Sequence, residues 1–234
     1  MEDDRLSRLE HDVERLIAPA WRRRTQGEPR WPSAVSILVL IGLQWSLPDR
    51  LSLGPRWLLP SIEVVLIAVL MAANPRRIEP GRGWLRPLSL VLLAVANLGN
   101  AWSVWRLVAE LTGGHELGTA AELLTSGGAV WLINVLVFAV WYWEADRGGP
   151  LKRVIGEKQQ PDLLFPQMGI AQLAREWEPQ FVDYLYLAFT NSTAFSPTDT
   201  LPLARWAKAL MMLQATLSLL IAALVVAKAV NALQ

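Results

Sequence analysis

The chain has 234 residues, of which 53% are hydrophobic and 18% charged, with no cysteine, two histidines and a net charge of +1. This composition excludes a disordered chain, a disulfide scaffold and a thiolate metal centre, and it gives no global attraction to nucleic acid. We therefore expect no metal site, no cofactor and no nucleic-acid partner.

Residues 1–30 are predicted to form a cytoplasmic amphipathic segment. Apolar side chains recur in it at helical spacing and form one stripe, which consists of Leu6, Leu9, Val13, Leu16 and Ile17. Such a helix suits self-association into a homo-oligomer or attachment to a membrane surface. It equally suits packing against the ends of the chain's own helices.

Five stretches with almost no charge predict five transmembrane helices in a lipid bilayer. Each approaches the about 20 apolar residues that a helix needs to cross a bilayer. Tryptophans lie near the ends of these stretches, as is typical of the membrane–water interface. The stretches are Trp31–Pro48, Trp57–Pro75, Pro87–Trp105, Leu123–Trp143 and Ala209–Ala227.

These stretches predict an all-α membrane protein with four transmembrane helices in 31–143 and a last one in 204–234. A polar segment, 144–180, connects the two parts. Lys and Arg are concentrated before the first stretch, between the second and third, and after the fourth. Because such residues stay on the cytoplasmic side, we expect a cytoplasmic N-terminus in a bacterial inner membrane and a periplasmic loop around Gly113–Gly118.

Four polar side chains within the predicted spans are candidates for a functional role. Glu63 is a carboxylate at membrane depth, which is costly and points to function, although its closeness in sequence to Arg56 also suits an interfacial position. We expect Glu63 to face the bundle interior and to pair with an Asn or Ser. Asn97, Asn100 and Asn134 are expected to line a polar path or to join helices through hydrogen bonds.

The segment 181–203 departs from the pattern of the five spans. It begins with helical spacing of apolar residues and continues into a run rich in hydroxyl side chains, which Pro197 interrupts. We predict a half-helix followed by a non-helical stretch over Thr190–Thr200 that re-enters the membrane or lies at its interface. Irregular backbone at membrane depth is tolerated where it is buried in protein or lines a wet cavity.

Oxygen-bearing side chains of this segment form a candidate ion site. Hydroxyl, carbonyl and carboxylate oxygens suit hard cations, so a monovalent cation is the expected ligand. The same residue types also cap helices, and Asp199 equally suits the start of the last helix. The candidate residues are Asp183, Thr190, Asn191, Ser192, Thr193, Ser196 and Asp199.

Several blocks of the sequence resemble a family of uncharacterised bacterial polytopic inner-membrane proteins. They are DYLYLAFTNSTAFSPTD, then PLARWAK and AVNAL, with GEPRWP, WYWEADRGGP and LLFPQM upstream. The resemblance covers most of the chain and implies no known activity. The segment from Asp183 to Asp199 is also distantly similar to potassium-channel pore loops, but it lacks both filter glycines, so potassium selectivity is not implied.

We favour a channel-like ion-binding or ion-conducting membrane protein that uses the 183–199 segment. The alternative is a structural or interaction membrane protein without transport activity. An enzyme is not expected, because the acids Asp183, Asp199 and Glu63 come without the convergent bases or metal ligands that catalysis needs.

Overall fold

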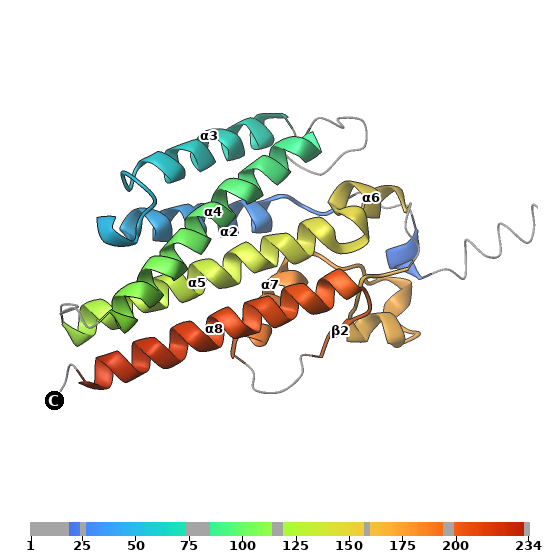
Figure 1. The fold of residues 1–234 in the computed structure, drawn as a ribbon. Helices are drawn as coiled ribbons and strands as arrows, with labels where there is room; N and C mark the ends of the chain where they lie inside the picture. The colour runs from blue at the N-terminus through green and yellow to red at the C-terminus, as the bar shows by residue number, and fades with distance from the viewer. Residues whose placement is uncertain are drawn as a thin grey trace, which may run out of the picture.

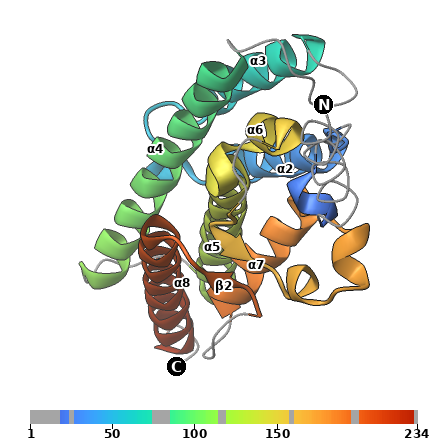
Figure 2. The same cartoon turned by 90° about the vertical axis from the view of Figure 1, so that its right-hand side faces the viewer.

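The computed structural model describes residues 19–23, 27–73, 85–113, 119–156, 160–193 and 199–231. These residues form a bundle of helices with α5 at its centre (Figures 1 and 2). The main helices are α2 (Trp31–Ser46), α3 (Leu58–Ala73), α4 (Leu85–Thr112), α5 (Ala120–Ala145), α7 (Phe181–Thr193) and α8 (Arg205–Asn231).

Short elements join these helices. Two strands, β1 (Leu163–Leu164) and β2 (Leu201–Pro202), pair antiparallel. The remaining elements are short helices: η1 (Ala20–Arg22), η2 (Asp49–Leu51), η3 (Asp146–Gly148), α6 (Pro150–Ile155), η4 (Pro166–Gly169) and η5 (Leu173–Arg175). The predicted all-α class is therefore confirmed.

Three helical stretches of the described chain are long and apolar enough to cross a membrane. They are α4, α8 and the stretch Ala121–Ile155, which contains α5. The apolar helices α2 and α3 have 16 residues each and are shorter than a typical span. The five predicted stretches thus correspond to three full-length helices and two short ones.

Local sequence signals set both ends of α5. Thr119 and Glu122 form a capping box, in which each side chain accepts a hydrogen bond from the other residue's backbone N–H. At the other end, Arg147, Gly148 and Gly149 have φ angles of 55°, 80° and 98°. Because a right-handed helix cannot continue through such angles, the chain leaves α5 in a tight turn.

The bundle has an apolar core, but it also buries several polar side chains and exposes many large apolar ones. Glu63, Asn134 and Gln214 are 0% exposed, whereas Val65 is 61% and Met212 is 71% exposed. Polar residues are normally outside a soluble protein, and large exposed apolar surfaces mark contact with a partner or a membrane. The apolar exterior therefore fits a membrane protein.

The start of α7 is fixed beside the end of α5. The hydroxyl of Tyr184 donates a hydrogen bond of 2.7 Å to the carboxylate of Asp146, directly after α5. Further along α7, the ring of Phe189 packs edge-on against Trp131 of α5, with a centroid distance of 5.9 Å. Hence α7 extends from the end of α5 alongside that helix.

The chain after α7 comes back to the same end of α5. The backbone N–H of Leu203 donates to the carbonyl of Asp162 at 2.8 Å, and β2 pairs with β1. The backbone N–H of Asp162 in turn donates to the carboxylate of Asp146 at 3.1 Å. The segment between α5 and α8 therefore enters the bundle as a helix and returns to its starting end, from which α8 departs (Figure 1).

The prediction of non-helical backbone from Thr190 is wrong for the first part of that stretch, because α7 continues to Thr193. The hydroxyls of Thr190 and Thr193 donate to the carbonyls of Tyr186 and Phe189, one turn earlier, so they do not compete with the helix. Pro197 and the helix predicted in residues 1–18 lie outside the described residues.

Gly127→Ala is expected to destabilise the contact between α5 and α8 by about 1–3 kcal/mol through overpacking. A Cβ at Gly127 would lie 2.4 Å from Cγ2 of Val225. Gly128→Ala is the matched control, because a Cβ there meets nothing within 4 Å. Thermal unfolding in detergent should show the loss only for Gly127→Ala, and adding Val225→Ala should reverse it. Equal stability of the two glycine variants would contradict this packing.

Candidate functional site

Gln214 of α8 is the hub of a buried polar group where α5, α7 and α8 meet. Its Oε1 accepts hydrogen bonds from the Tyr142 hydroxyl at 2.7 Å and from Asn191 Nδ2 at 2.8 Å. Its Nε2 donates to the Ser192 hydroxyl and to the carbonyl of Ala188, both at 2.8 Å. The amide of Gln214 therefore joins all three helices and orients the end of α7.

A second buried group lies near the middle of the bundle. Asn134 of α5 donates from Nδ2 to the Ser218 hydroxyl at 3.1 Å, and its Oδ1 accepts from Nδ2 of Asn100 at 3.1 Å. Ser218 and Gln214 are one turn apart on α8 and are 1% and 0% exposed. The groups around Gln214 and Asn134 are thus neighbours along one face of α8.

Glu63 and Gln44 lie on the other side of Asn100. Glu63 of α3 is buried and faces Gln44 of α2, although the two side chains do not reach hydrogen-bonding geometry. A Cβ at Gly99, the residue before Asn100, would lie 3.2 Å from Gln44 Nε2. A crevice of about 20 Å³ borders Gln44 and is lined also by Gly99 and Ser103.

We call these residues, which are buried except for the half-buried Asn191 and Ser192, the polar line. It crosses the bundle from α3 through α2, α4, α5 and α8 to α7. Amide and hydroxyl groups both donate and accept hydrogen bonds, so such a line offers ligands to a cation or to bridging water molecules. Its members are Glu63, Gln44, Asn100, Asn134, Ser218, Gln214, Tyr142, Asn191 and Ser192.

The structure brings Asn191 and Ser192 together in the predicted ion segment, but it separates the other candidates from them. The carboxylate of Asp183 accepts the backbone N–H of Gln180 at 2.8 Å at the start of α7. Asp199 is exposed in a bend before β2, so it does not begin α8 at Arg205. Thr190 and Thr193 bond to their own helix. Ser196 lies outside the described residues.

Of the predicted intramembrane residues, some bond to other helices and one bonds only within its own helix. Asn100 and Asn134 bond to each other, whereas Asn97 donates only to the Leu93 carbonyl of its own helix, at 3.2 Å. Glu63 faces the interior as expected, but its neighbour is Gln44 rather than an Asn or Ser.

Sequence reasoning missed Gln44, Tyr142, Gln214 and Ser218. Gln214 and Ser218 are polar residues at positions i and i+4 within a largely apolar stretch, which is a detectable signal for one polar helix face. Gln44 lies near the end of its stretch and Tyr142 stands between two tryptophans. Both resemble interface residues in sequence, which hid their buried positions.

A buried ion cluster closes the end of the bundle where α5 ends. Glu28 accepts hydrogen bonds from Trp143 Nε1, from Arg153 Nη2 at 3.3 Å and from the Phe181 backbone N–H at 2.8 Å. Burial raises the pKa of the Glu28 carboxyl group, and the positive charge of Arg153 opposes that rise. The cluster therefore ties the segment before α2 to α5, α6 and α7.

Asp146 holds the second half of this cluster. Its carboxylate accepts from the Tyr184 hydroxyl and from the backbone N–H groups of Asp162 and Leu163. Burial raises the pKa of the Asp146 carboxyl group, and Arg153 again opposes the rise. The polar groups named here form hydrogen bonds with one another, so we interpret the cluster as structural: it holds this end of the bundle together.

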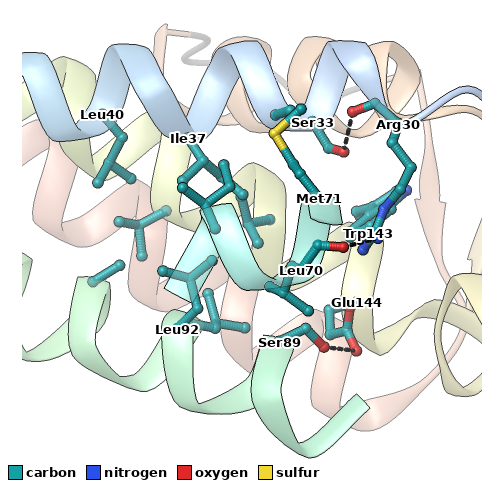
Figure 3. Close-up of a pocket in the computed structure, with 16 residues that line it drawn as sticks. Arg30, Ser33, Ile37, Leu40, Leu70, Met71, Ser89, Leu92, Trp143 and Glu144 are labelled. Atoms are coloured by element: carbon teal, nitrogen blue, oxygen red, sulfur yellow. Dashed lines mark hydrogen bonds between the residues drawn. The ribbon is translucent and has the colours of Figure 1, made fainter. Parts of the chain in front are cut away.

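A separate, mostly apolar cavity of about 50 Å³ lies between α2, α3, α4 and α5 (Figure 3). At its polar end, Arg30 Nη1 donates to the Leu70 carbonyl at 2.8 Å, and the Ser89 hydroxyl donates to Glu144 at 3.1 Å. None of its lining residues belongs to the polar line.

Within the described residues, no three His, Asp or Glu side chains gather as a metal site would require. Comparison of the chain with protein-family models, curated proteins and solved structures finds no match.

Proposed function

We propose that this chain is a channel-like protein of the bacterial inner membrane that moves a monovalent cation across the bilayer along the polar line. The observation that carries the proposal is the polar line itself. Buried side chains with hydrogen-bonding capacity are rare inside membrane bundles, and they mark pathways for ions and protons. Here they extend over six helices rather than joining a single pair.

The positions of the helix ends support a five-span topology. Arg30, before α2, bonds to Leu70 near the end of α3. Ser89, near the start of α4, bonds to Glu144 near the end of α5. Glu28 connects the first of these ends to Trp143. Because these ends share one side, α2 to α5 alternate in direction and α8 departs from that side, which supports counting α8 as the fifth span of the proposed topology.

Loop charges orient this topology. The shared end adjoins the Lys- and Arg-rich segments, which stay in the cytoplasm. The N-terminus is then cytoplasmic and the C-terminus periplasmic. The two short helices α2 and α3 are accommodated by local thinning of the bilayer, at fractions of a kcal/mol per Å of mismatch.

Single-cysteine labelling tests the topology, because the chain has no cysteine of its own. Asp49 and Arg175 are both exposed. Asp49 follows the end of α2 that is far from Arg30, whereas Arg175 lies on η5, which contacts η1 before α2. In intact spheroplasts, an impermeant thiol reagent should label Asp49→Cys and leave Arg175→Cys unlabelled until the membrane is opened. The reverse pattern would overturn the orientation.

In this proposal α7 is a re-entrant half-helix that enters from the cytoplasmic side. Its last turn carries Asn191 and Ser192, both half-buried, to Gln214 inside the bundle. Broken and re-entrant helices place polar groups at membrane depth in channels and transporters. The end of α7 would then be the cytoplasmic mouth of the polar line, and the crevice beside Gln44 its periplasmic mouth.

A structural or interaction role without transport is the second candidate. The observation that favours it is that Asn134 uses both ends of its amide in bonds to neighbouring helices and is 0% exposed. Such bonds also act as glue between transmembrane helices, worth about 0.6 kcal/mol on average.

Flux measurements on the purified chain in liposomes separate the two candidates. Gradients of H⁺, Na⁺ and K⁺ are imposed one at a time, with protein-free liposomes as the control. We expect protein-dependent flux of one of these cations. If none moves faster than in protein-free liposomes, translocation is rejected and the structural role remains.

A further inference from the structure

Gln44 and Glu63 have four buried polar atoms without a hydrogen-bond partner among the described residues. They are Nε2 and Oε1 of Gln44 and both carboxylate oxygens of Glu63. The two residues are 7% and 0% exposed. An unpaired buried polar group costs about 1–3 kcal/mol, and native structures contain few of them. Four such atoms on two facing side chains call for a protonation state that lets the two side chains pair with each other.

A single proton on the Glu63 carboxyl group would give all four atoms a hydrogen-bond partner. An ionised carboxylate only accepts hydrogen bonds, so it leaves Oε1 of Gln44 without a donor. A protonated carboxyl group has one donor and one acceptor, and so does the facing edge of a primary amide. The acid O–H of Glu63 then donates to Gln44 Oε1, while Gln44 Nε2 donates to the other oxygen of Glu63. All four atoms are paired at once.

The surroundings of Glu63 offer no counter-charge to an ionised carboxylate. Among the described residues, the environment of the Glu63 carboxyl group consists of its burial and the neighbouring Gln44 side chain. No charged side chain there acts on the carboxyl group. Helices α2 and α4 pack on α3, and Gly99 of α4 lies next to the Gln44 amide. Arg56 lines the crevice, but its side chain is 58% exposed and lies 3.9 Å from Asp49.

We propose that Glu63 and Gln44 form a proton-binding site, and that the cation that moves along the polar line is the proton. The second half of this inference rests on the proposed function, whereas the first half does not. Glu63 releases its proton to a water molecule that enters through the crevice beside Gln44, the water becomes hydronium, and Glu63 regains a proton by the reverse step. The crevice volume of about 20 Å³ admits one water.

Infrared spectroscopy of the purified full-length chain tests the site without any transport assay. The carbonyl stretch of a protonated carboxyl group is absent from a carboxylate. At neutral pH we expect such a band in the wild-type protein, its loss in Glu63→Gln, and its shift in Gln44→Leu, where the amide partner is gone. Glu63→Gln is expected to fold, because two amides form the same pair of hydrogen bonds, and its melting temperature provides the check.

Absence of a Glu63-dependent band at neutral pH would overturn the proton site. So would a rise in melting temperature with Na⁺ that Glu63→Gln abolishes, because it would assign the site to a metal cation. Proton flux in liposomes separates this inference from the proposed function. A Glu63 band without flux keeps the site and rejects translocation, whereas flux without the band keeps translocation and rejects the site.

Discussion

Arg153→Met is expected to lower the free energy of unfolding by about 3–5 kcal/mol, because removing one partner of a buried ion pair leaves the other charge uncompensated. Arg153 is 7% exposed and lies 3.3 Å from the carboxylate of Glu28. It also donates to the backbone carbonyls of Trp143 and Asp146, at 2.6 and 3.1 Å. The substitution therefore leaves a carboxylate and two carbonyls without this donor. Chemical denaturation in detergent measures the loss.

Arg175→Met is the matched control for this prediction. Arg175 is exposed on η5, and a surface substitution of this kind changes stability by about 0.5 kcal/mol or less. Adding Glu28→Gln to Arg153→Met should recover part of the loss, because the stranded negative charge is removed. If Arg153→Met is as stable as Arg175→Met, the buried ion cluster does not hold this end of the bundle together.

Asn134→Leu is expected to reduce cation flux in liposomes by about tenfold or more, since each 1.4 kcal/mol added to a barrier costs a factor of ten. Asn134 joins Asn100 to Ser218 in the middle of the polar line. Leucine has a similar size but neither donor nor acceptor, so it interrupts the polar line without opening a cavity. Flux is measured at equal protein content after the fold is checked by melting temperature.

Asn97→Leu makes the same chemical change outside the polar line. The Asn97 amide donates to the Leu93 carbonyl of its own helix, so its loss leaves the polar line intact. We expect Asn97→Leu to keep the wild-type flux. Full flux in a correctly folded Asn134→Leu protein would show that ions do not pass this point.

The helices were predictable because their signals are local. Charge-free stretches, the capping box at Thr119 and the glycines after α5 can all be read along the chain. The inward position of Glu63 was also predictable, because a carboxylate in an apolar helix has no favourable place in lipid. The extent of α7 was not, because hydroxyl residues such as Thr193 suit both helix ends and helix interiors that bond backward.

The partners within the candidate site could not be predicted from the sequence. Gln214 contacts Tyr142 and Ser192 through helix crossings that bring distant segments together. Those crossings depend on packing across the bundle, such as the close approach of Gly127 to Val225. Asp199 follows Asn191 and Ser192 in one polar run of the sequence, but it is exposed in a bend before β2, whereas those two residues bond to Gln214.

Modification of a single cysteine at Ser218 tests the polar line most directly. Ser218 is 1% exposed at the midpoint of the polar line, and the chain has no other cysteine. Ser218→Cys should conduct, should react with a small water-soluble thiol reagent that follows the conducted ion, and should then lose its flux. Ser46→Cys, away from the polar line, should keep its flux after the same treatment. Flux that persists in Ser218→Cys, whether the cysteine is fully modified or never reached by the reagent, would contradict a conducting polar line.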